Sequence, residues 1–172
     1  MIRRVASGEF TAMLRVINAA AQAYKGVIPE DRWKEPYMPA AELQREIIAG
    51  VQFYGWYDRK QLLGVMGLQP VRDTTLIRHA YVHPDHQRRG MGGTLLEHLL
   101  ELTDTQDILV GTWRDATWAI RFYEKQGFRQ VTADEKDRLL RAYWDIPERQ
   151  VDASIVLRKV LESTGDGPKA LC

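Results

Sequence analysis

The most informative segment of the chain is His83-Pro84-Asp85-His86-Gln87-Arg88-Arg89-Gly90-Met91-Gly92-Gly93-Thr94. It follows an apolar run over residues 76–82, which is typical of a strand, and it precedes an amphipathic run over residues 95–102, which is typical of a helix. The pattern predicts a strand, a glycine-rich loop and a helix, in that order. Because the first turn of a helix has backbone N–H groups without intrahelical partners, such a loop can bind phosphate.

The composition of this loop also suits an anion. Its three glycines would let a phosphate approach the backbone, and its glutamine and two arginines supply donors and positive charge. Two other kinds of phosphate-binding loop are excluded. A Walker loop needs Lys followed by Ser or Thr after its last glycine, and no such pair is present here. A dinucleotide-binding fingerprint would need glycine where Leu95 stands. On the loop alone, a glycine-rich turn without a ligand stays open.

Three consecutive matches resolve this ambiguity. Residues 87–92, Gln-Arg-Arg-Gly-Met-Gly, resemble the Q/RxxGxG/A motif that binds the acyl-CoA pyrophosphate in the GNAT N-acetyltransferase superfamily. Residues 81–84 and 119–128 are similar to that family's flanking segments. The resemblance implies a single-domain α/β fold, with a central mixed but mostly antiparallel sheet that is splayed into a V and has helices on both faces. It also implies acetyl-CoA as acyl donor.

Composition limits the remaining possibilities. A chain of 172 residues suits one domain, which we expect over residues 1–160, followed by a flexible tail over residues 161–172. With 24 Lys and Arg against 23 Asp and Glu, no overall field favours nucleic acid or a membrane surface. The first residues turn polar too early for a signal peptide and no run of about 18 apolar residues occurs, so we expect a cytoplasmic protein. Cys172, as the sole cysteine, excludes an internal disulfide.

Periodicity predicts the remaining elements. An antiparallel meander of strands leads into the glycine-rich loop, and strands alternate with helices after it. The expected strands cover residues 2–5, 51–57, 62–68, 75–82, 107–113, 128–131 and 150–160, and the expected helices cover residues 10–24, 40–49, 92–103, 116–126 and 133–144.

The resemblance assigns the donor site and one catalytic group. The pantetheine arm of acyl-CoA would lie along the main chain of Tyr81 and Val82, as an added strand does, and an N–H near Val82 would bind the developing oxyanion. Tyr123 would be the general acid, because a phenol with a pKa of about 10 stays protonated at neutral pH. The predicted donor-binding residues are Tyr81, Val82, Gln87, Arg88, Arg89, Gly90, Met91, Gly92, Gly93 and Thr94.

The general base is not fixed by the resemblance. Many GNAT proteins carry Glu where this chain has Leu76, and the polar residues of the same strand are Arg78 and His79. We take His79 as the candidate base, with an ordered water or another carboxylate as alternatives. Counting by twos places Arg78 and His79 on opposite faces of the strand, although relatives often have a bulge here. A second departure is Ala116, where many relatives have Asn; Asp115 or Thr117 could replace it.

The acceptor would be chosen by the segment between the first two helices. The candidate acceptor residues are Tyr24, Trp33, Tyr37 and Arg78, and the acidic residues Glu30, Asp31 and Glu35 could attract a cation. Equally, the aromatic side chains could anchor a loop while the charges face water. No metal is expected, since the histidines show no metal-ligand spacing with cysteines or carboxylates.

The favoured function is transfer of an acetyl group from acetyl-CoA to a primary amine of a small molecule, peptide or protein, by direct attack in a ternary complex. A covalent acyl-enzyme is disfavoured, because the sole cysteine is the last residue. The alternative is a non-catalytic acyl-CoA-binding or sensing module on the same fold. A nucleic-acid module is disfavoured by the near-zero net charge. A homodimer stays open.

Overall fold

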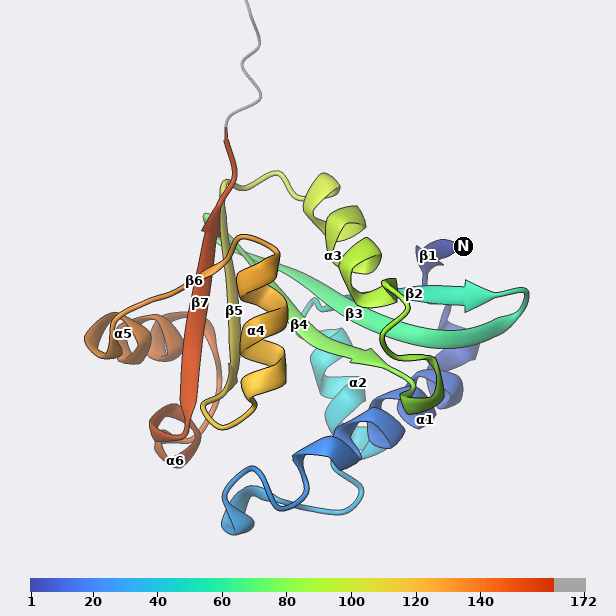
Figure 1. Cartoon of the computed structure of the whole chain (residues 1–172), viewed down its shortest axis with the longest axis horizontal. Helices are drawn as coiled ribbons and strands as arrows, with labels where there is room; N and C mark the ends of the chain where they lie inside the picture. The colour runs from blue at the N-terminus through green and yellow to red at the C-terminus, as the bar shows by residue number, and fades with distance from the viewer. Residues whose placement is uncertain (163–172) are drawn as a thin grey trace, which may run out of the picture.

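The computed structural model describes residues 1–162, so most of the expected tail lies outside the described residues. Seven strands form one sheet in the order β1-β2-β3-β4-β5-β7-β6 (Figure 1). Every pair of neighbours is antiparallel except β4 and β5. The mixed, mostly antiparallel sheet is thereby confirmed. The strands are β1 Ile2–Arg4, β2 Gln52–Asp58, β3 Gln61–Val71, β4 Thr74–Val82, β5 Asp107–Trp113, β6 Arg129–Gln130 and β7 Ser154–Val160.

Helices cover both faces of the sheet (Figure 1). On one face, leucines of α3 and the buried Tyr123 of α4 pack against β3, β4, β5 and β7. On the other face, α1 and α2 pack against β2 and β3, while α5 and α6 pack against β4, β5 and β7. The helices are α1 Phe10–Ala21, α2 Ala40–Ile48, α3 Met91–Glu101, α4 Thr117–Lys125, α5 Ala133–Tyr143 and α6 Glu148–Asp152.

The sheet is split between β4 and β5. These two strands pair only from Thr74 opposite Asp107 to Ile77 opposite Val110. Beyond this point β4 stays paired with β3 as far as Val82, and β5 stays paired with β7 as far as Trp113. The sheet therefore has two arms that separate toward the ends of β4 and β5, which confirms the expected V (Figure 1).

A bulge interrupts β4 within the arm that leads to the glycine-rich loop. Val65 lies opposite Tyr81 and Gly67 lies opposite Arg78, so His79 and Ala80 together face the single residue between them on β3. His79 takes a left-handed backbone conformation with φ of 52°. The side chains of Arg78 and His79 both reach α2, whose Glu46 contacts each of them. Counting by twos is therefore wrong for this pair.

The end of the chain differs from the prediction. The expected final strand from residue 150 begins only at Ser154, because residues 148–152 form α6. Pro147 precedes this helix at its N-cap, and Val151 is buried within it against α5 and β5. The N-cap of α4 is Ala116. None of the helices formed by residues 1–162 has the length and apolar character needed to cross a membrane.

Candidate active site

The opening of the V contains a cavity of about 650 Å³. Residues 78–82 of β4 form one side of it and residues 110–113 of β5 form the other. The glycine-rich loop, α3 and α4 line the cavity from one face of the sheet, while the end of α1 and the end of α5 line it from the other. A donor and an acceptor could therefore reach the same point from opposite faces.

The glycine-rich loop presents backbone donors to this cavity. Gly90 is the N-cap of α3 and has φ of 79°, which glycine adopts without strain. The first amide to bond back within the helix is that of Thr94, which donates to the Gly90 carbonyl at 3.1 Å. The amides of residues 91–93 precede it and face out of the helix end, where an anion is favoured. The residues present thus fit the pyrophosphate of CoA.

Two of the glycines have a second role that the sequence did not show. A Cβ on Gly92 would lie 3.4 Å from the Phe122 ring, and one on Gly93 would lie 3.2 Å from Nε2 of Gln126. Both neighbours belong to the α4 region, so these glycines let α3 pass close to α4. The two glycines therefore allow close packing of α3 against α4, in addition to the close approach of a phosphate.

The polar side chains of the loop divide into two groups. Gln87 and Arg88 line the cavity, and Nε2 of Gln87 donates to the Val82 carbonyl at 3.1 Å, which ties the loop to the end of β4. Arg89 and Thr94 do not line the cavity. Arg89 donates to the Asp85 carbonyl at 3.3 Å, and the Thr94 hydroxyl donates to the Gly90 carbonyl at 3.2 Å. Arg88 is therefore the arginine placed for an anion.

The edge of β4 is free where the arms separate. The amide of His83 donates to the Leu63 carbonyl of β3 at 2.8 Å. Because amides alternate in direction along an antiparallel strand, the Val82 amide points away from β3 and into the opening. This edge can accept an added strand and offers an N–H at the place where the sequence predicted an oxyanion donor.

Tyr123 lies in the wall of the cavity. Its side chain is 4% exposed and packs edge-on against Phe122 and Phe128, with ring centroids 5.0 and 5.5 Å away. Burial raises the pKa of the Tyr123 phenol, so the hydroxyl keeps its proton at neutral pH. The environment agrees with a proton donor.

Aromatic side chains form the acceptor side. Tyr24 and Tyr37 line the cavity with Tyr81, and burial raises the pKa of all three phenols. The indole N–H of Trp113 donates to the Tyr37 hydroxyl at 3.0 Å, which joins the segment after α1 to the end of β5. Trp33 stacks behind Tyr37, with centroids 5.7 Å apart, and does not line the cavity. The aromatic residues thus both anchor the segment and shape the wall.

The acidic residues of the same segment do not form an attractive patch. Asp31 pairs with Arg149 of α6 at 3.0 Å, and Glu35 pairs with Lys25 at 3.7 Å. Among the described residues that line the cavity there is no Asp or Glu, and the arginines there are Arg78 and Arg88. The wall therefore carries no carboxylate to attract a cationic acceptor.

Glu46 is a largely buried carboxylate behind the cavity wall, and no sequence pattern pointed to it. Glu46 of α2 lies 2.8 Å from Nη1 of Arg78 and 3.3 Å from Nε2 of His79, and the three side chains are 14–19% exposed. Burial alone would raise the Glu46 pKa, but His79 and Arg78 together outweigh it and lower that pKa. Arg78 also donates to Gln69 at 3.0 Å. Its guanidinium is thus engaged by the protein.

Ala116, where many relatives have Asn, is fully buried, and neither Asp115 nor Thr117 lines the cavity. Within the described part of the chain, no group of three or more His, Cys, Asp or Glu side chains could hold a metal ion.

The comparisons with known proteins agree with this geometry. Residues 18–142 match the family model described as an acetyltransferase (GNAT) domain. The chain belongs to the GNAT acetyltransferase family. This GNAT protein is 34% identical over 92 residues to the [ribosomal protein bS18]-alanine N-acetyltransferase of Salmonella typhimurium, a match that covers 51% of the chain and 57% of that relative. It therefore spans little more than half the length of the curated relatives it matches.

Solved GNAT structures share the fold. The PaiA N-acetyltransferase of Thermoplasma acidophilum, determined in complex with coenzyme A, superposes with a TM-score of 0.70 at 18% identity, covering 93% of this chain and 98% of that one. The ribosomal-protein-S18-alanine N-acetyltransferase of Escherichia coli superposes with a TM-score of 0.65 at 18% identity, covering 97% of each chain.

Proposed function

We propose that this GNAT protein transfers an acetyl group from acetyl-CoA to a primary amine by direct attack in a ternary complex. The observation that carries the proposal is the shared cavity, since the amides at the start of α3, the free edge of β4 and the buried Tyr123 all open onto it. An anion site, a main-chain docking edge and a proton donor are the groups that a CoA thioester requires.

Each step of the transfer is assigned to a residue of this chain. Bound acetyl-CoA supplies a thioester carbonyl that an amine can attack. His79 takes a proton from the attacking nitrogen as the C–N bond forms, and the Val82 amide stabilises negative charge on the carbonyl oxygen. Tyr123 gives its proton to the sulfur as the C–S bond breaks, and recovers one from solvent. Arg88 and the amides of residues 91–93 hold the pyrophosphate.

A peptide α-amine is the first acceptor to test. The matched relatives are named as N-acetyltransferases of an alanine of ribosomal protein bS18. An α-amine has a pKa near 8, against about 10.4 for a lysine side chain, so a larger fraction of the α-amine is neutral at pH 7. Polyamines and aminoglycosides fit less well, because no carboxylate of the described residues lines the cavity.

A non-catalytic acyl-CoA-binding module is the second candidate, favoured by Leu76 in place of the expected carboxylate and by Ala116 in place of Asn. One measurement tests both candidates, and a second separates them. Both predict that CoA raises the melting temperature, and no shift at millimolar CoA would contradict both. Only the enzyme releases free thiol from acetyl-CoA in the presence of an amine. The screen uses peptides with free N-termini, the same peptides with blocked N-termini as controls, amino acids, polyamines and aminoglycosides.

A further inference from the structure

We propose that Glu46 of α2 is a positioning residue that holds His79 in the tautomer and orientation of a general base. The inference rests on the proposed function, and it adds a residue from outside the strand and the loop that carry the GNAT motifs. Four observations carry it: the bulge in β4, the facing atoms of Glu46 and His79, the free ring nitrogen of His79, and the ion pair between Glu46 and Arg78.

The bulge brings the imidazole to α2. With its backbone φ of 52°, His79 leaves the regular alternation of β4, and its ring lies 5.8 Å from the Phe53 ring, measured between centroids. A left-handed conformation is uncommon for a residue other than glycine and is unfavourable on its own. The residue keeps this conformation at the point where β4 borders the cavity.

The two facing atoms define a tautomer. Nε2 of His79 and Oε2 of Glu46 are 3.3 Å apart; both atoms are buried, and neither makes a hydrogen bond of good geometry, so the contact between them is electrostatic. A neutral imidazole carries a proton on only one nitrogen, and a carboxylate at this distance favours the proton on Nε2. Nδ1 then keeps its lone pair. Because His79 is one of the residues that line the cavity, we assign Nδ1 as the nitrogen that accepts a proton from the acceptor amine.

Arg78 keeps Glu46 in the form that this role needs. Nη1 of Arg78 lies 2.8 Å from Oε2 of Glu46 and donates to Oε1 of Gln69 at 3.0 Å, while Nη2 donates to Oε1 of Glu46 at 3.3 Å. A nearby cation favours the ionised carboxylate. The charged groups around the imidazole are therefore Glu46 from α2 and Arg78 from β4, with Glu42 contributing at longer range through Arg78. Phe53 from β2 adds an uncharged wall.

Glu46 acts through His79 and not directly. Its Oε2 atom is buried, and Glu46 does not line the cavity. When Nδ1 of His79 accepts the proton of the attacking amine, the imidazolium gains a carboxylate partner at Nε2. Such a partner stabilises the imidazolium and fixes the orientation of the ring, as carboxylates do in other His–carboxylate pairs of active sites.

The test compares Glu46→Gln with the control Glu42→Gln. Glu42 lies one turn earlier on α2 and pairs with Lys34 at a more exposed position. We expect Glu46→Gln to lower kcat/KM by about 10- to 100-fold, with CoA affinity unchanged. The acid limb of the pH–rate profile should move to lower pH, because the protonated imidazole loses its carboxylate partner. Glu42→Gln should leave both unchanged.

A double variant separates positioning from general destabilisation. With His79→Gln already in place, adding Glu46→Gln should lower kcat/KM by less than about twofold, since the two residues act as a unit. Full additivity of the two losses, or an acid limb that stays in place in Glu46→Gln, would overturn the proposal.

Nitrogen NMR of the His79 ring tests the pair without turnover. The wild type should carry the ring proton on Nε2, whereas Glu46→Gln should populate both tautomers and Glu42→Gln should match the wild type. A wild-type ring with its proton on Nδ1, or an unchanged tautomer in Glu46→Gln, contradicts the positioning role. If the wild type binds CoA and shows this tautomer yet releases no thiol with any amine, the proposed function fails while the Glu46–His79 interaction stands.

Discussion

The two ends of the β4–β5 pair differ in what their polar groups do. At the closed end the strands share backbone hydrogen bonds, and side chains from both strands join one ion-pair network. At the open end the strands share none, and side chains bridge the arms instead, through Trp113 with Tyr37 and Arg149 with Asp31. Polar residues hold the arms together at the closed end, whereas at the open end other polar groups border a cavity.

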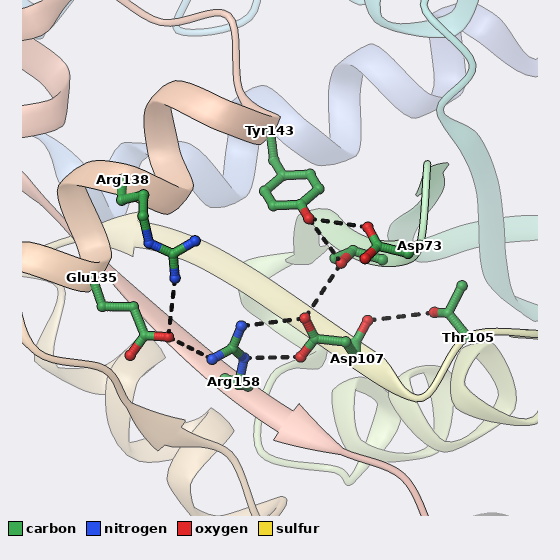
Figure 2. Close-up of polar contacts among 8 residues, drawn as sticks. Asp73, Thr105, Asp107, Glu135, Arg138, Tyr143 and Arg158 are labelled. Carbon is green, nitrogen blue, oxygen red and sulfur yellow. Dashed lines mark hydrogen bonds and ion pairs between the residues drawn. The ribbon is translucent and has the colours of Figure 1, made fainter.

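Figure 2 shows the closed-end network. Asp107 of β5 pairs with Nε of Arg158 on β7 at 2.8 Å and accepts the Thr74 hydroxyl of β4 at 3.3 Å. Arg158 also pairs with Glu135 of α5, and the Tyr143 hydroxyl of α5 donates to Asp73 at 3.1 Å. Three strands and a helix are thus linked where the V begins. Asp107 and Glu135 both pair with Arg158, which fits a structural role.

The largest expected effect is at the open end. Tyr123→Phe should lower turnover of acetyl-CoA by about 100-fold or more, since a positioned general acid contributes about 10²- to 10⁴-fold. Its ring packing against Phe122 and Phe128 is retained, so the melting temperature and the Kd for CoA should hardly change. Thiol-release kinetics and calorimetry check both. An unchanged rate would refute the assigned role.

The second largest effect should distinguish the roles of the two loop arginines in CoA binding. Arg88→Glu should weaken CoA binding by about 10- to 100-fold, because a charge-assisted contact of about 1.5–3 kcal/mol is lost. Arg89→Glu should weaken it less, since Arg89 lies outside the cavity lining and bonds the Asp85 carbonyl. Isothermal titration calorimetry of both variants measures the difference. Equal losses would show that the loop rearranges around the donor.

The smallest effect is at the closed end. Asp107→Asn should lower the free energy of unfolding by about 1–2 kcal/mol, because Arg158 loses a charged partner and Thr74 a hydrogen-bond acceptor. The Kd for CoA should stay within twofold. Asp104→Asn, at an exposed neighbouring position, is the control and should be neutral in urea unfolding. A change in CoA affinity with unchanged stability would contradict the separation of the two ends.

Sequence patterns predicted the parts of this molecule that depend on neighbouring residues. The loop before α3, the strand order up to β4, and Tyr123 on a helix followed from periodicity, glycine spacing and family resemblance. The bulge at His79 did not, because it is a property of how β3 pairs with β4. Glu46 gave no signal of its own on an amphipathic helix, since its partners are distant in the chain. The helix before β7 was missed because a five-residue helix is too short for its period to show.

We expect the open end of the V to bind acyl-CoA at the start of α3. A crystal structure of the chain with CoA is the decisive test. It should show pyrophosphate oxygens about 3 Å from the amides of residues 91–93, and the pantetheine arm along the edge of β4 at Val82. CoA bound elsewhere, or a pyrophosphate held away from these amides, would contradict it.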